Sequence, residues 1–108
     1  MSSNKYAEHE HKVWDSDIAQ FFDINIKGLE SISIHSWRTG FTSCHPIEDI
    51  WWEWAGGNGV AFIELHVIRE GGLHWRFSCT PDDTRWLRKE GVRQGQDLND
   101  PAIAKYCF

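Results

Sequence analysis

The chain has 108 residues, a net charge of −5, 14% aromatic residues and seven tryptophans. This length supports one domain with its own hydrophobic core, and the aromatic content excludes a disordered chain. The acidic charge argues against direct nucleic-acid binding, and no stretch is long and apolar enough to span a membrane, so we expect a cytoplasmic protein.

The chain is predicted to consist of a mobile tail over residues 1–12 and a single globular domain over 13–108. A short helix is expected at 14–22, where Ile18, Phe21 and Phe22 lie on one side. Residues 24–34 alternate between apolar and polar side chains, which predicts two strands that reverse around Gly28.

The segment HPIEDIWWEWAGG, residues 45–57, carries three of the tryptophans. Pro46 suits the first position of a helix. Apolar residues follow at 47, 50, 51 and 54, which is the spacing of one helical face. We therefore predict an amphipathic helix that ends at Gly56 and Gly57.

Residues 60–79 form two apolar runs around Glu70-Gly71-Gly72. A three-residue turn pairs Val67 with Trp75 and Leu65 with Phe77, whereas a two-residue turn places polar residues opposite the apolar face, so the first register is preferred. The segment 80–91 has the best helix signals of the chain, with Thr80 as the cap, Pro81 in the first position and Gly91 at the end. A last short helix is expected at 101–108.

This order of elements predicts an α+β fold, in which an antiparallel sheet of about four strands packs two to four short helices mainly on one face. Cys44, Cys79 and Cys107 are widely spaced without a CxxC motif, which argues against a metal ribbon or a redox pair, and we expect them to be small buried apolar residues. No cofactor motif is found, because the glycines of GGNG (56–59) leave a predicted helix, whereas a phosphate loop enters one.

The predicted tryptophan helix provides the first candidate site. Trp52 lies outside the apolar stripe of this helix, beside Glu48, Asp49 and Glu53. An exposed indole among carboxylates is typical of an interface that binds a basic protein. Burial of Trp52 under the N-terminal segment or the 38–45 loop is the alternative.

The outer face of the predicted 60–79 hairpin provides the second candidate site. In the preferred register this face holds Glu64, His66, His74 and Arg76, which are groups that can perform acid–base chemistry near neutral pH. The alternative is an ordinary solvated sheet face. Trp14, Trp37, Trp75 and Phe77 are candidates for lining a cavity beside these groups.

Three further groups carry weaker signals. Cys44 and His45 are adjacent, which is a poor geometry for a nucleophile and its base. The run EHEH, residues 8–11, could chelate an ion adventitiously. The basic segment Arg85, Arg88, Lys89 and Arg93 includes Trp86, but it is small for a nucleic-acid site on an acidic domain.

The sequence favours a small acidic inhibitor, similar in kind to an immunity protein or an antitoxin, which blocks a larger basic partner such as a toxin or a nuclease. This interpretation makes the chain a binding protein rather than an enzyme. The alternative is a small-molecule-binding protein or an enzyme that uses Glu64, His66 and His74. Homodimerisation is compatible with either.

Overall fold

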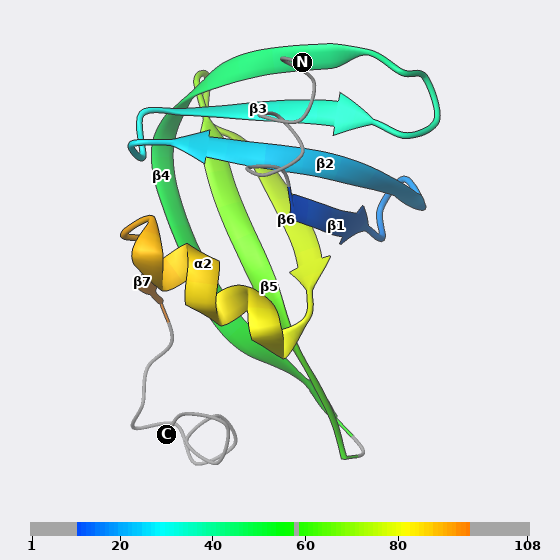
Figure 1. Cartoon of the computed structure of the whole chain (residues 1–108), viewed down its shortest axis with the longest axis vertical. Coiled ribbons are helices and arrows are strands. Elements are labelled where there is room, and N and C mark those ends of the chain that lie inside the picture. Colours follow the sequence, from blue (N-terminus) through cyan, green and yellow to red (C-terminus); the bar gives the residue numbers. More distant parts are fainter. Residues whose placement is uncertain (1–10, 58, 96–108) are drawn as a thin grey trace, which may run out of the picture.

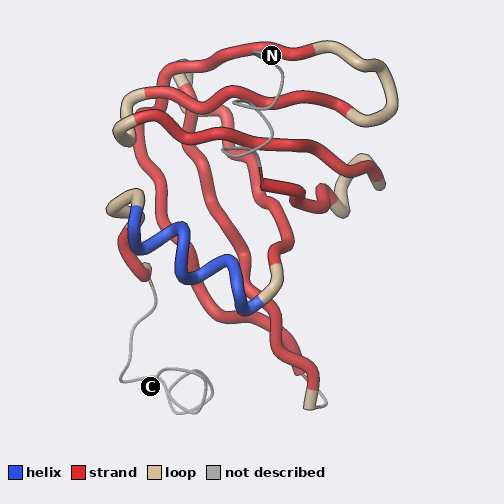
Figure 2. The backbone as a smooth tube through the Cα atoms, in the orientation of Figure 1, coloured by secondary structure: helices blue, strands red, loops and turns tan. Residues whose placement is uncertain are grey.

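The computed structural model describes residues 11–57 and 59–95, so the expected helix at 101–108 and most of the predicted tail lie outside the described residues. Figures 1 and 2 show that strands make up most of this part of the chain. The elements are β1 (His11–Asp15), β2 (Gln20–Lys27), β3 (Ser31–Ser36), β4 (Thr42–Gly57), β5 (Val60–Arg69), β6 (Leu73–Cys79), the 3-10 helix η1 (Pro81–Asp83), α2 (Thr84–Lys89) and β7 (Arg93–Gln94).

The prediction of an α+β fold with about four strands and several helices is wrong. The described residues form one seven-stranded sheet in the order β3-β2-β1-β6-β5-β4-β7, with a single short α-helix. A further pairing joins β3 to the first part of β4, so strands β1 to β6 close into a ring of antiparallel neighbours. This closure leaves only the short β7, which pairs with β4 in parallel, outside the ring.

The predicted helix of residues 46–55 is also wrong, because this segment belongs to the long strand β4. A bulge between Ile47 and Asp49 shifts the register against β5. One extra residue in a strand places two side chains three positions apart on the same face. Ile47 and Ile50 therefore show the spacing of a helical stripe although the chain is extended.

The helix expected at 14–22 is wrong for a different reason. β1 and β2 form a hairpin in which Asp15 pairs with Gln20. In the turn between them, the amide of Asp17 donates a hydrogen bond of 2.9 Å to the side chain of Asp15, and Ala19 has a positive φ of 53°. Asp15 therefore ends β1 and its side chain stabilises the turn, and the chain at 16–19 reverses direction instead of forming a helix.

Three local predictions are confirmed. β2 and β3 form the expected hairpin around Gly28. β5 and β6 pair in the preferred register, with Val67 opposite Trp75 and Leu65 opposite Phe77. Helical structure spans residues 81–89 as expected, and the carboxylate of Asp83 accepts hydrogen bonds from both the amide and the hydroxyl of Thr80 in a capping box.

The core lies inside the ring, where alternate residues of the strands point inward. It includes Val13, Ile24, Ile32, Trp52, Ile63, Leu65 and Phe77. Figure 1 shows β2, β3 and α2 in front of β4 and β5, so that α2 covers the part of these strands that β2 and β3 leave open. Leu87 of α2 is fully buried and completes the core there. Among the described residues, no helix has the length and apolarity that crossing a membrane requires.

Candidate functional site

The first predicted site, formed by Glu48, Asp49, Trp52 and Glu53, does not exist as a surface. Trp52 is only 1% exposed, because position 52 of an extended β4 points into the core. The carboxylate of Asp49 lies 3.2 Å from the guanidinium of Arg93. Glu48 is exposed, and Glu53 contacts His66 on the outer face. The prediction of an exposed Trp52 among acidic residues is therefore wrong.

The second predicted set does share a face. Glu64 and His66 on β5 and His74 and Arg76 on β6 alternate with the core residues of these strands, so their side chains all point outward. His66 lies opposite Arg76, and it is bonded diagonally to His74, with 2.8 Å between His66 Nδ1 and His74 Nε2. Arg76 turns toward Asp17, with 3.8 Å between their charged atoms.

Glu53 of β4 joins this group, although the sequence did not place it there. It lies directly opposite Glu64, and both carboxylates reach the same imidazole nitrogen. His66 Nε2 is 2.9 Å from Oε1 of Glu53 and 3.1 Å from Oε1 of Glu64. We call Glu53, Glu64, His66 and His74 the outer polar cluster.

The imidazole of His66 is unusually enclosed for a side chain on the outer face of a sheet. The residue is 6% exposed. The indole of Trp51, the cross-strand partner of His66, stacks on the imidazole with ring centres 5.0 Å apart and planes 2° apart. The guanidinium of Arg93 lies 5.5 Å from the centre of the Trp51 ring. Trp51 is thus a wall of the cluster, whereas the sequence placed it in the core.

The hydrogen bonds constrain the protons of the cluster. An ionised carboxylate only accepts hydrogen bonds, so His66 Nε2 carries a proton and donates it to Glu53. Desolvation, followed by the charges of His66 and Arg76, lowers the pKa of His74 from its usual value of 6.5, which favours the neutral ring at pH 7. The chain Glu53–His66–His74 therefore connects a half-buried carboxylate to an exposed imidazole and can move a proton between them.

The cluster is also short of positive charge. Glu53 and Glu64 face each other across two strands, and like charges in such a pair are destabilising. Their side chains are 31% and 26% exposed, so water screens them only in part. One N–H of His66 cannot give a well-aligned hydrogen bond to two carboxylates. The arrangement therefore has the chemistry of a site that accepts a cation.

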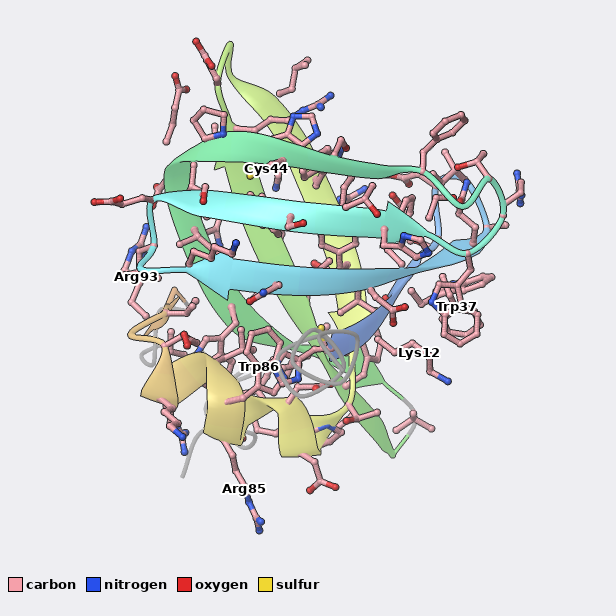
Figure 3. The ribbon with its side chains drawn as sticks, turned by 45° about the horizontal axis from the view of Figure 1, so that its top comes forward. Lys12, Trp37, Cys44, Arg85, Trp86 and Arg93 are labelled. Carbon is pink, nitrogen blue, oxygen red and sulfur yellow. The ribbon has the colours of Figure 1, made fainter. Side chains whose placement is uncertain are left out.

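The other candidates are not brought together. Cys44 is exposed, so its expected burial is wrong, whereas that of Cys79 is confirmed. His45 on the same strand as Cys44 contacts Trp75 edge-on, with ring centres 4.9 Å apart. The predicted aromatic cavity is not formed: Phe77 is buried in the core on the inner face, opposite to the polar groups. Trp14 packs instead against Phe21, and Trp37 does the same. Figure 3 shows Trp37 beside Lys12, away from Arg93.

A shallow groove of about 250 Å³ lies beside the bulge of β4. Its lining residues are Leu29, Ile47, Glu48, Asp49, Ile50, Gly91 and Arg93. It does not include the outer polar cluster. No known protein family, curated protein or solved structure matches the chain.

Proposed function

We propose that this protein binds a small cationic ligand on the outer face of β4, β5 and β6, with Glu53, Glu64 and His66 as the ligand-binding groups. The observation that carries this proposal is the pair of carboxylates that converge on one enclosed imidazole. Such a pair lowers the stability of the fold in the absence of a counter-charge, and destabilising arrangements of this kind are found in proteins mainly at functional sites. Trp51 supplies a flat apolar wall beside the charged groups.

The proposed role differs for the two glutamates. Glu53 accepts the proton of His66 Nε2 and so holds the imidazole in place. Glu64 lies close to the same nitrogen, but the N–H at this nitrogen donates its hydrogen bond to Glu53. We therefore assign Glu64 to the ligand and Glu53 to both the ligand and the orientation of His66.

The test compares thermal unfolding of Glu64→Gln with that of the parent chain, without any added ligand. The substitution removes the like-charge pair and gives Glu53 an amide donor, so the free energy of unfolding should rise by about 0.2–1 kcal/mol. That corresponds to a few degrees in Tm for a domain of this size. Glu30→Gln, at an exposed turn position, controls for the change in net charge.

A structural role for the cluster predicts the opposite outcome. If the Glu64 carboxylate serves mainly to hold His66, Glu64→Gln should lower the free energy of unfolding, as Glu53→Gln should in either case. A measurable loss in Glu64→Gln relative to Glu30→Gln would overturn the proposal, and a broken hydrogen bond to a charged group would make that loss about 1.5–3 kcal/mol.

Inhibition of a basic protein partner is a second hypothesis, with weaker support than the cationic-ligand site. The net charge of −5 and the exposed Glu48 support this hypothesis. It has lost its aromatic anchor, since Trp52 is buried, and Asp49 already pairs with Arg93. The outer polar cluster therefore gives the better-supported function.

A further inference from the structure

The donor atoms of the outer polar cluster are spaced like the ligands of a metal ion. Oε1 of Glu53, Oε1 of Glu64 and Nε2 of His66 all lie within 4.8 Å of one another. The two distances from the nitrogen are 2.9 and 3.1 Å. For bonds of about 2.1 Å, neighbouring ligands are about 3.0 Å apart in an octahedral site and about 3.4 Å apart in a tetrahedral one. A small adjustment of flexible glutamate side chains would therefore admit an ion.

We propose that Glu53, Glu64 and His66 bind a divalent transition-metal ion. This inference rests on the proposed function, because it identifies the cationic ligand of the same site. Two carboxylates and a neutral imidazole carry a charge of −2, which a divalent ion neutralises. On binding, the ion takes the place of the proton on His66 Nε2, and the imidazole stays neutral because Nδ1 takes up a proton in exchange.

The surroundings of His66 match those of a metal-binding histidine. Such a residue commonly donates its second ring N–H to a neighbouring acceptor, which fixes the ring and its tautomer. With a metal on Nε2, the proton of His66 lies on Nδ1, and it donates to His74 Nε2 across the observed 2.8 Å. The stacked Trp51 restricts rotation of the same ring. His74 is thus a positioning residue and not a ligand.

The donor set selects the class of ion. Imidazole and carboxylate together suit Zn²⁺, Co²⁺, Mn²⁺ and Fe²⁺, whereas Mg²⁺ and Ca²⁺ prefer sites made of oxygen alone. Three protein ligands leave at least one position for water or another small ligand, because even a tetrahedral ion takes four. Glu53 and Glu64 remain partly exposed, so this open position would face the solvent.

The experiment titrates the full chain with Zn²⁺ by calorimetry at pH 7 under reducing conditions, and repeats the titration with Co²⁺ by absorbance. One ion per chain is expected. Glu64→Gln should weaken the affinity at least about 10-fold and keep the fold, because it leaves the His66–Glu53 hydrogen bond in place. His66→Gln should abolish binding, with circular dichroism as the check that this variant folds.

Matched controls test two other groups of the chain that could bind a metal ion. The double variant Glu8→Gln, His9→Gln removes two of the four candidate ligands of the EHEH run, and Cys44→Ser removes the exposed thiol. Both should bind Zn²⁺ as the parent does. The inference is overturned if no ion binds, if the Glu64→Gln affinity is unchanged, or if a control variant loses binding.

The two proposals fail in different measurements. If Glu64→Gln stabilises the metal-free protein but the parent binds neither Zn²⁺ nor Co²⁺, the cationic-ligand site stands and the metal is wrong. If Glu64→Gln destabilises the metal-free protein, the argument for the site itself is wrong.

Discussion

Replacement of Trp52 by alanine should remove much of the free energy of unfolding of this protein, whereas replacement of the neighbouring Trp51 should lower it only slightly. Trp52 is 1% exposed, and Trp51 is partly exposed on the opposite face of β4. Removal of a buried tryptophan costs about 3–5 kcal/mol through lost burial and the cavity that remains. Loss of a half-exposed aromatic stack costs about 0.5–1.5 kcal/mol.

A phenylalanine at position 52 refines the test. The indole Nε1 of Trp52 is buried and has no hydrogen-bond partner among the described residues. Trp52→Phe removes this unpaired donor, which by itself relieves about 1–3 kcal/mol. We therefore expect Trp52→Phe to cost clearly less than Trp52→Ala, in spite of its smaller ring.

The assay is urea unfolding followed by far-ultraviolet circular dichroism, because the substitutions change the fluorescence of the chain. With a slope of about 1–3 kcal/mol per molar urea, Trp52→Ala should lower the midpoint by about 1–5 M, and Trp51→Ala by about 0.2–1.5 M, which is the smaller shift at any one slope. Equal effects of the two substitutions, or a larger effect of Trp51→Ala, would refute the assignment of Trp52 to the core side of an extended β4.

Three further predictions concern other parts of the fold. A Cβ at Gly56, where φ is +118°, would collide with the carbonyl oxygen of Val60, so Gly56→Ala should lower the free energy of unfolding by more than about 2 kcal/mol. Gly59→Ala is the control, because open space surrounds this position, and it should lower the free energy by less in the same urea titration. Burial, followed by the charge of Asp83, raises the pKa of the Cys79 thiol, so peptide mapping after mild alkylation should find this residue unlabelled; labelling at the rate of an exposed thiol would contradict its burial. Burial, followed by the charge of Arg69, lowers the pKa of His45 from 6.5, so the midpoint of its NMR titration should lie below that value. The contribution of His45 to the free energy of unfolding should decline as the pH drops below 6.5, because the unfolded chain then binds protons more readily than the folded one. A midpoint above 6.5 would refute this.

Local patterns predicted the parts of this fold that are local. The register of β5 and β6 follows from side-chain parity around a three-residue turn, since any slip by one residue exposes Leu65 and Val67. The helix after Thr80 follows from its cap and from Pro81. Both depend only on residues that are close in the sequence.

The ring of strands depends on contacts that no local pattern shows. The pairing of β3 with the first part of β4 uses the bulge at Ile47–Asp49, where the strand leaves one partner and joins the next. That bulge produces a helix-like spacing of apolar residues. The signal against a helix was the run IWWEW, because aromatic residues and isoleucine favour strands and the positions 50, 52 and 54 alternate.

The candidate site was half predictable for the same reason. Glu64, His66 and His74 were placed on one face because their hairpin was correctly registered. Glu53 and Trp51 were assigned to a helix, so their position across from Glu64 and His66 could not be foreseen. An extended reading of residues 50–54 would have put Trp51 and Glu53 on the face opposite to Trp52.

The protonation of the His66 ring tests the outer polar cluster most directly. A long-range proton–nitrogen NMR spectrum of the metal-free protein should show Nε2 protonated, with a slowly exchanging proton held by Glu53. On addition of Zn²⁺, that proton should disappear, and Nε2 should shift as a metal ligand while Nδ1 becomes protonated. A His66 ring that exchanges its protons as fast as a solvated histidine, and does not respond to Zn²⁺, would contradict both the convergence of the two carboxylates on this residue and the function proposed from it.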